Sequence, residues 1–226
     1  MSKERIQKIL AQNGFSSRRK IESLIIEGRV FINDKPAKLG DKISIDEKVF
    51  IDGKEVRLAQ RISSELIMYN KPVGEECTHG SSKKTVFDGL PRPKSGKWIS
   101  IGRLDINTSG LLLITNDGQL ANDIIHPSKE IEREYIVRVR GKPSDSSLKK
   151  LTSGVVIDKQ EISFTDLVRG KETSSHTWFA LVILSGKNRS VRKLWSSIGH
   201  DVSRLKRVRL GKLFLPKDLK EGKFKR

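Results

Sequence analysis

The sequence predicts an α+β protein in two parts, a small N-terminal unit over about residues 1–60 and a larger domain over residues 61–226. The first observation is the spacing of apolar residues, which recur at helical intervals near the start and then fall into short runs between turn residues. The second is that strand-sized apolar runs and helix-sized periodic segments are interspersed from Glu65 onward. The third is the length, since 226 residues suffice for one large or two modest domains.

The N-terminal unit is predicted to hold two helices followed by a hairpin. Apolar residues in segment 6–10 have helical spacing, and the pair Asn13-Gly14 stops that helix. Ser16-Ser17 then offers an N-cap, and Gly28 ends a second helix. Extended runs follow at residues 29–32, 41–45 and 49–51. We therefore expect a compact helix–helix–hairpin unit that ends between residues 54 and 64.

The larger domain is predicted to be rich in strands. Apolar runs predict strands over residues 66–69, 99–102, 111–115, 134–139 and 178–184. Helical periodicity predicts helices over residues 119–125, 144–151 and 190–198. Residues 80–84 and 91–97 are expected to form flexible loops.

The chain is strongly basic, because 45 Lys and Arg residues against 27 Asp and Glu residues give a net charge of +18. An excess of this size favours a polyanionic partner, since neutralised phosphates release counterions. A solvated basic surface is the alternative. Residues 186–226 hold 14 basic and three acidic residues, a net charge of +11, so we expect the main electrostatic footprint there.

The sequence also limits the compartment. The single cysteine, Cys77, excludes an internal disulfide and suits a reducing environment. The first residues lack the apolar core of a signal segment, and no run approaches the roughly 18 apolar residues of a membrane span. We expect a cytoplasmic protein with no membrane association, and a monomer by default.

A basic cluster, Arg18-Arg19-Lys20, opens the second predicted helix. Cations there oppose the helix dipole, so a phosphate bound against the cluster, together with Arg5 and Lys8, would explain their position. An ordinary exposed helix face is the alternative. The segment RIQKILAQNGFSSRRKIESLIIEGRVFINDKPAKLGDKI resembles an S4 domain, a small RNA-binding module with an αL-like fold. That resemblance implies that these five residues bind RNA.

Asp105 lies in a polar loop between two apolar strands. Without further context, such an Asp most often caps its own turn. The surrounding segment GRLDINTSGLLLITNDG is similar, without a gap, to the active-site signature of the RsuA/RluB branch of pseudouridine synthases. The resemblance implies that Asp105 is the catalytic carboxylate. It also implies a catalytic domain with a mixed, mostly antiparallel sheet and a site in a cleft across that sheet.

The same resemblance assigns roles to three further residues. Tyr135, in EREYIV, would stack on the flipped uracil. Without the resemblance, the residue would be interpreted as an ordinary core tyrosine. Arg192, in GKNRSVRKLW, corresponds to the arginine that pairs with the catalytic carboxylate and would keep it ionised. Arg103 would enter the RNA stack where the uridine leaves.

The segment before Arg192 is expected to face the RNA backbone through Lys187, Asn188 and Arg189. Its structural interpretation is a basic loop that runs into an amphipathic helix. Ser190 departs from the family, whose members carry an acidic residue there, so a local contact can differ.

The implied reaction suits a carboxylate. It breaks the uracil N1–C1′ bond, turns the base and rejoins it through C5, and these steps need no redox chemistry, metal or phosphate donor. No cofactor and no metal are therefore expected. The Asp can stabilise positive charge at C1′, attack that carbon or remove a sugar proton, and all three roles stay open.

The substrate expected from the segments KPVGEECT, TVFDGLP and HPSKEIEREY is a stem-loop of large-subunit ribosomal RNA, because they resemble RluB-type enzymes. Small-subunit or other RNA is the alternative. A non-catalytic S4-type RNA-binding or ribosome-assembly factor would also fit the charge, but it has no need of the Asp105, Tyr135 and Arg192 set. A nuclease would need metal-ligand spacing or paired histidines, and the sequence has neither. Phosphate-binding and dinucleotide-binding glycine motifs are absent as well.

Overall fold

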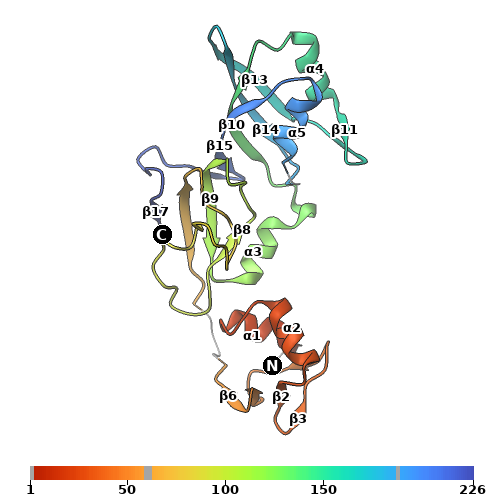
Figure 1. The fold of residues 1–226 in the computed structure, drawn as a ribbon, viewed down its shortest axis with the longest axis vertical. Coiled ribbons are helices and arrows are strands. Elements are labelled where there is room, and N and C mark those ends of the chain that lie inside the picture. Colours follow the sequence, from red (N-terminus) through yellow and green to blue (C-terminus); the bar gives the residue numbers. More distant parts are fainter. Residues whose placement is uncertain (1–2, 59–62, 187–188) are drawn as a thin grey trace. The chain divides into compact units, whose positions relative to one another are not determined.

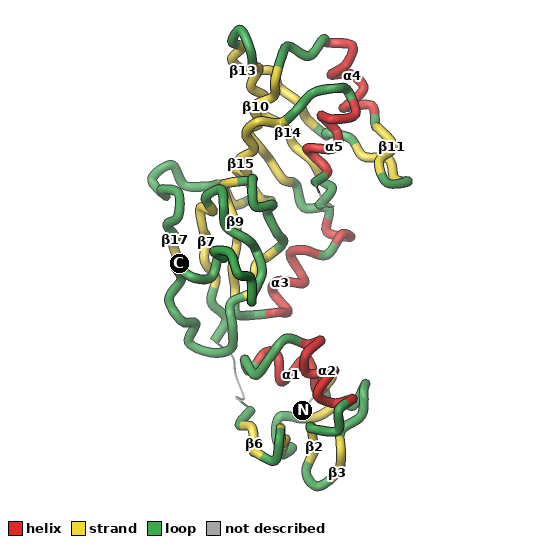
Figure 2. Tube along the Cα trace, viewed as in Figure 1, coloured by secondary structure: helices red, strands yellow, loops and turns green. Residues whose placement is uncertain are grey.

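The structure is a computed structural model that describes residues 3–58, 63–186 and 189–226. It divides into two compact units, which the ribbon and the tube trace display (Figures 1 and 2). The first holds the residues up to Glu65 together with Pro91–Ile99 and Thr115–Gly118, and the second holds Leu66–Leu90, Ser100–Ile114 and Gln119–Arg226. Within the described residues no helix is both long and apolar enough to cross a membrane.

The first unit begins with the two predicted helices, α1 (Ile6–Gln12) and α2 (Arg18–Ile26). The predicted cap is confirmed, because the Ser17 hydroxyl accepts the Lys20 N–H at 3.2 Å. Two small sheets follow, one pairing β1 with β4 and the other ordered β3-β2-β5-β6. The strands of this unit are β1 (Glu4–Arg5), β2 (Val30–Ile32), β3 (Lys35–Pro36), β4 (Lys42–Ile43), β5 (Val49–Ile51) and β6 (Lys54–Val56). The core between helices and strands is fully buried at Ile6, Leu10, Ile21 and Ile43.

Two segments from later in the chain complete the first unit, and Asn116 joins them to it. Its side-chain oxygen accepts the Glu65 N–H at 2.8 Å. Its amide nitrogen donates to the carbonyl oxygens of Ser63 and Ser95 at 2.9 and 3.1 Å. The compact unit therefore contains short pieces from beyond residue 90 as well as the N-terminal segment.

A nine-stranded sheet forms the centre of the second unit. Its order is β13-β14-β10-β15-β9-β7-β17, with β16 beside β15 and β8 beside β9. Strands β9 and β15 are parallel, whereas β13–β14, β14–β10, β10–β15 and β7–β17 are antiparallel, so the expected mixed, mostly antiparallel sheet is confirmed. The strands are β7 (Leu66–Lys71), β8 (Ile99–Ile101), β9 (Ser109–Thr115), β10 (Arg133–Arg140), β13 (Asp166–Glu172), β14 (His176–Ile183), β15 (Val202–Leu210), β16 (Leu213–Phe214) and β17 (Phe224–Lys225).

Short helices and one small ribbon accompany this sheet. They are α3 (Gly118–Ile125), a 3-10 turn (Pro127–Lys129), α4 (Asp145–Ser153), the ribbon β11 (Val155–Ile157) with β12 (Gln160–Ile162), and α5 (Ser190–Ser197). All five strands and three helices predicted for this part of the chain are present, with ends that differ by at most two residues. The sequence prediction missed β13 and β15, and also the short strands β11, β12, β16 and β17. The sequences of β13 and β15 are charged and weakly apolar; β13 pairs with the next strand, β14, whereas β15 pairs with β10 and β9, which lie far earlier in the chain.

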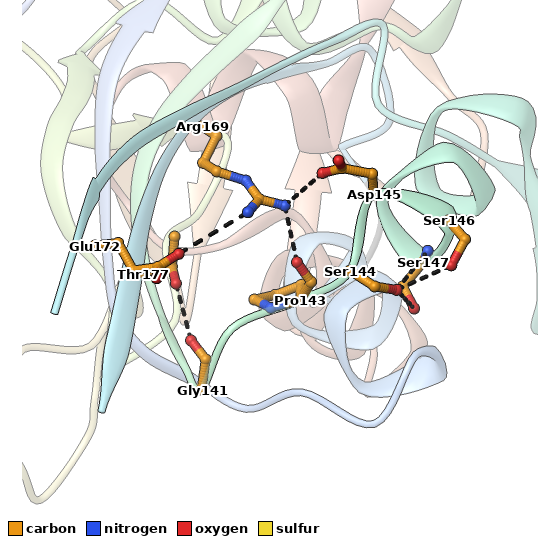
Figure 3. A network of polar contacts seen from close by, with 9 residues as sticks. All are labelled: Gly141, Pro143, Ser144, Asp145, Ser146, Ser147, Arg169, Glu172 and Thr177. Atoms are coloured by element: carbon orange, nitrogen blue, oxygen red, sulfur yellow. Dashed lines mark hydrogen bonds and ion pairs between the residues drawn. The ribbon is translucent and has the colours of Figure 1, made fainter. Parts of the chain in front are cut away.

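Helices α4 and α5 pack against one face of the sheet, the face that carries Phe179 of β14. The Phe179 ring lies 4.8 Å from the Trp195 ring of α5. Arg169 of β13, whose Cα partner is Phe179, binds the start of α4, donating to the Asp145 carboxylate at 2.7 Å and the Pro143 carbonyl at 2.8 Å (Figure 3). Side chains on this face are therefore covered, and alternate residues point to the other face.

Candidate active site

Asp105 lies in the turn that connects β8 to β9. Its backbone carbonyl accepts the Thr108 N–H at 3.0 Å and closes the turn. Its carboxylate is partly exposed and accepts no hydrogen bond from any described residue. The alternative in which this Asp caps its own turn therefore does not hold in the described part of the chain, and the carboxylate is free to meet a substrate.

Donors from outside the turn hold its first residues. The thiol of Cys77 contacts both the carbonyl oxygen and the N–H of Leu104, at 3.4 and 3.5 Å. The Gly74 N–H donates to the carbonyl of Ile106 at 2.7 Å. Both donors belong to the loop after β7, so this loop fixes the near side of the Asp105 turn.

Two cations hold the far side of the turn. The Lys71 ammonium donates to the carbonyls of Thr108 and Pro72, each at 2.9 Å. The Arg192 guanidinium of α5 donates through Nη2 to the Asn107 carbonyl at 2.9 Å. Every carbonyl from Leu104 to Thr108 therefore has a partner, four of them from outside the turn, and this fixes the backbone that carries Asp105.

Lys71 is completely buried at the end of β7. Burial lowers its pKa below the usual 10.5, while the negative charges of nearby groups, including Asp105, act in the opposite direction. The ammonium binds only backbone carbonyls among the described residues, so its charge is not cancelled by an ion pair. This charge lies in the electrostatic neighbourhood of Asp105.

Arg192 contacts the backbone of the turn. Its Nη1 atom donates to the Val202 carbonyl at 2.9 Å, so its two terminal nitrogens bridge β15 and the turn. Burial lowers the pKa of Arg192, and the charge of Asp105 opposes that shift. Within the described residues no ion pair joins the two side chains, and Nε of Arg192 is buried without a partner. The direct pairing expected from the sequence stays a prediction.

Tyr135 lies on β10, and 8% of it is exposed. Its Cα partner on β15 is Arg207, whose own Cα partner on β9 is Gly110. The row Tyr135–Arg207–Gly110 thus crosses three strands, which puts Tyr135 roughly 10 Å from the strand that follows the Asp105 turn. Tyr135 points to the face that α5 covers, since Val137 and Phe179 lie on the same face.

Arg207 is a buried cation in this row, with 2% of it exposed. Its Nε atom donates to the Leu111 carbonyl at 2.8 Å, and its Nη2 atom is buried without a partner. The neighbouring strand approaches closely because residue 110 is a glycine with φ of +105°. A Cβ atom at Gly110 would lie 2.1 Å from the carbonyl oxygen of Arg207.

The remaining predicted RNA-binding residues fall into two groups. Arg103 is exposed in the loop before Asp105, and Arg189 is exposed immediately before α5, with φ of 56°. Lys187 and Asn188 lie outside the described residues. In the first unit, Lys8 forms an ion pair with Glu4 at 2.6 Å, and Arg5 is exposed. Arg18, Arg19 and Lys20 are exposed in the first turn of α2 and have no ion pair in the described part.

Sequence reasoning missed most of the residues that hold the turn. In the sequence, Lys71 is one residue of the segment KPVGEECT, Cys77 is the single cysteine, and Arg207 is one of the 14 basic residues of segment 186–226. A buried lysine in an apolar strand, as in LIMYNK, is the signal that marks Lys71. Among the described residues no group of three or more His, Cys, Asp or Glu side chains is placed to hold a metal ion.

Two family models together match most of the chain. The family model described as RNA pseudouridylate synthase matches residues 65–197, and the S4 domain model matches residues 4–49. Proteins named ribosomal large subunit pseudouridine synthase B are similar to this chain over nearly the full length of this chain. The one from Escherichia coli strain K12 is 44% identical, over 97% of this chain and 77% of the relative. Those from Pseudomonas aeruginosa and Xanthomonas campestris are 44% and 45% identical, over 98% and 97% of this chain.

The chain spans only 59% and 46% of the length of these last two relatives. A solved structure described as "Crystal structure of pseudouridylate synthase" has a TM-score of 0.68 at 24% identity, covering 98% of this chain and 94% of the other. A second, described as "Structure of H/ACA RNP bound to a substrate RNA containing 2'-deoxyuridine", has a TM-score of 0.53 at 17% identity and covers 69% of this chain and 50% of the other. Both support the fold. With its synthase model, its S4 model and relatives above 40% identity, the chain belongs to the RNA pseudouridylate synthase family.

Proposed function

We propose that this chain isomerises a uridine to pseudouridine in large-subunit ribosomal RNA. The single observation that carries the proposal is the Asp105 turn. Among the described residues nothing donates a hydrogen bond to its carboxylate, while all five backbone carbonyls of residues 104–108 accept one. Such rigidity is what a catalytic group needs, since small misplacements are costly in rate. The names of relatives at 42–45% identity support the same reaction and the same RNA.

Asp105 is proposed as the catalytic carboxylate and Tyr135 as the ring that stacks on the flipped base. Stacking offsets part of the few kcal/mol that extruding a base costs. Arg192 orients the turn through the Asn107 carbonyl, and RNA binding can bring its guanidinium to the carboxylate. Arg103, exposed beside the turn, is proposed to occupy the place that the uridine leaves.

The reaction is a rearrangement within one nucleotide. The N1–C1′ bond breaks, the uracil turns while it is held, and C5 bonds to C1′, after which C5 loses a proton and N1 gains one. Asp105 acts at the sugar, as an electrostatic partner of C1′, as its nucleophile or as a base for a sugar proton. The proposal needs no cofactor, because no atom or electron enters or leaves.

The two parts of the chain are proposed to divide the work. Residues 1–60 would grip the RNA through Arg5, Lys8, Arg18, Arg19 and Lys20, and residues 61–226 would bind the target stem-loop and perform the chemistry, with Lys187, Asn188 and Arg189 on the RNA backbone. Neutralised phosphates would supply most of the affinity. A ribosomal RNA substrate implies work in the cytoplasm, and a monomer suffices because every proposed group is in one chain.

The test is pseudouridine mapping by carbodiimide labelling and primer extension on ribosomal RNA incubated with wild type and with Asp105→Asn. Wild type should give one new stop in large-subunit RNA. Asp105→Asn should give none while it binds the RNA with nearly unchanged affinity, because the substitution is isosteric. A stop in both samples would reject Asp105 as the catalyst. No stop with wild type on naked RNA or on ribosomal subunits would favour a non-catalytic RNA-binding factor.

A further inference from the structure

The sheet face opposite Tyr135 and α5 carries side chains that the proposed reaction does not use. In β10 the residues alternate, so Tyr135 and Val137 face the helices, whereas Ile136, Arg138 and Arg140 point the other way. Strand pairing places Trp178 of β14 and Arg204 of β15 beside Arg138. This set, with Lys206 two residues after Arg204, is called the outer cationic face.

An aromatic ring and a guanidinium form the centre of the outer cationic face. The guanidinium carbon of Arg138 lies 5.8 Å from the centroid of the Trp178 ring, in cation–π geometry. Arg138 also donates through Nε to the Ser203 hydroxyl at 3.0 Å, which fixes the direction of the side chain. Trp178 is half-buried, whereas 5% of Trp98 and none of Trp195 is exposed, so among the three tryptophans it is the one open to solvent.

The cations of this face are close together and not neutralised. Arg138 and Arg204 are direct cross-strand partners, an arrangement that repels and destabilises an antiparallel pair unless an anion is present. Arg140 and Arg204 are exposed, and Lys206 is partly exposed. In the described part of the chain none of these four forms an ion pair. Glu134, the acid of β10 on the same face, is already held by Arg209 at 2.7 Å.

We propose that the outer cationic face is a second RNA-binding surface, in which Arg138, Arg140, Arg204 and Lys206 contact phosphates and Trp178 contacts a base or ribose. A basic surface with an aromatic platform fits single-stranded RNA, because every base has a π-face and every nucleotide a charge. The opposite face of the sheet carries Tyr135, so the second surface binds RNA outside the target stem-loop. This inference rests on the proposed RNA substrate, and it adds a contact that the reaction itself does not need.

The first test compares two triple variants that remove the same charge. One is Arg138→Gln, Arg204→Gln and Lys206→Gln, and the control is Lys149→Gln, Lys150→Gln and Lys159→Gln, whose lysines are exposed on α4 and in the β11–β12 turn. Affinity for a large-subunit ribosomal RNA transcript is measured at several KCl concentrations. The outer-face variant should lower the slope of log affinity against log salt by about 2, since each phosphate contact contributes about 0.7–0.9. Equal slopes for the two triple variants would overturn the proposal.

The second test uses tryptophan fluorescence and needs no catalysis. Titration with oligouridylate should quench the emission of wild type, and Trp178→Phe should remove that quenching, because the other two rings are buried. Unchanged fractional quenching in Trp178→Phe would overturn the role of the ring. The double variant Arg204→Gln with Lys206→Gln leaves the Arg138–Trp178 pair intact and serves if the triple variant folds poorly.

These results separate the two proposals. If the outer face binds RNA and the reaction is as proposed, the triple variant keeps the wild-type kcat at saturating RNA and shows a raised KM. If wild type makes no pseudouridine but the salt slopes differ, the proposed reaction fails and the RNA surface stands. If wild type makes pseudouridine and the salt slopes are equal, the proposed reaction stands and the second RNA-binding surface is rejected.

Discussion

Replacing Lys71 by methionine removes the ammonium group that holds the Asp105 turn and keeps a buried side chain of similar length. Two carbonyl oxygens lose their donor, those of Thr108 and Pro72, each 2.9 Å from Nζ. The bond to Thr108 is buried, so the unpaired oxygen costs about 1–3 kcal/mol, and the partly exposed Pro72 oxygen costs less because water can replace the donor.

A gain opposes this loss. Burial is the main influence on the pKa of Lys71 and lowers it, so the methionine variant is relieved of a desolvated charge. We expect a net loss of about 2 kcal/mol in the free energy of unfolding, which is roughly a 30-fold change in the folding equilibrium. For a chain of this size the melting temperature should fall by about 4–8 °C. Turnover should fall by about 10- to 100-fold, because the turn that carries Asp105 loosens, while RNA affinity is unchanged.

The free energy of unfolding is measured by urea titration, with the fluorescence of the buried Trp98 and Trp195 as the signal. Turnover is measured as pseudouridine formation at saturating RNA. The matched control is Lys83→Met, whose ammonium is exposed and lies 3.8 Å from Glu76. If Lys71→Met unfolds at the same urea concentration as Lys83→Met and turns over equally fast, the ammonium–carbonyl bonds do not hold the turn and the reasoning is refuted.

Four further substitutions or measurements probe other parts of the structure. Gly110→Ala should destabilise the fold by about 3 kcal/mol or more, because its Cβ would meet the Arg207 backbone at 2.1 Å; a melting temperature equal to wild type would contradict the close approach. Arg192→Lys keeps the charge but offers one nitrogen where the arginine uses two, for the carbonyls of Asn107 and Val202. We therefore expect kcat to fall about 10-fold or more with KM little changed. A wild-type kcat would show that the bridge between the two carbonyls is dispensable. Burial raises the pKa of the Cys77 thiol above its usual value of 9, so this thiol ionises at a lower pH in the unfolded chain than in the folded one, and stability falls as the pH rises past 9. Disulfide-exchange labelling of the native thiol should therefore need a higher pH than labelling in urea. Identical pH profiles would count against burial as the cause. Ser17→Ala should cost about 1 kcal/mol through loss of the α2 cap, with Ser16→Ala as the control, and equal losses would deny the cap its role.

Local signals explain which elements the sequence predicts well. Helix α2 of the first unit is marked by a capping serine and a terminal glycine, and these act within a few residues of the backbone they serve. Strand β9 is a continuous apolar run and is buried at every position, so its type and place are evident without knowledge of its partners.

The missed strands lack such local signals. Strand β15 reads VSRLKRVRL and carries four cations, so the sequence favours a basic segment that serves the RNA. Its position in the middle of the sheet depends on β10 and β9, which lie far earlier in the chain. Arg207 and Arg209 are therefore partly removed from the electrostatic footprint, the first by burial and the second by ion pairs with Glu132 and Glu134.

The candidate site also contains residues that the sequence identifies and residues that only the fold brings together. Asp105 is recognisable because a long contiguous segment surrounds it, and Tyr135 and Arg192 follow from shorter segments of the same kind. The bonds that fix the turn come from Lys71, Cys77 and α5, each separate in sequence, so no window of residues around Asp105 contains them. Geometry of this type is a property of the assembled sheet.

The way in which the Asp105 turn is held has a consequence for how such a protein can change. Four of its carbonyls are bonded by groups outside the turn, so the path of the backbone does not depend on the side chains of Ile106 and Asn107, which are exposed. These two positions can therefore be exchanged during divergence or by design without moving the carboxylate. The surface that these two positions present and the position of the carboxylate are in this sense independently adjustable, because the first is set by exposed side chains and the second by bonds to the backbone.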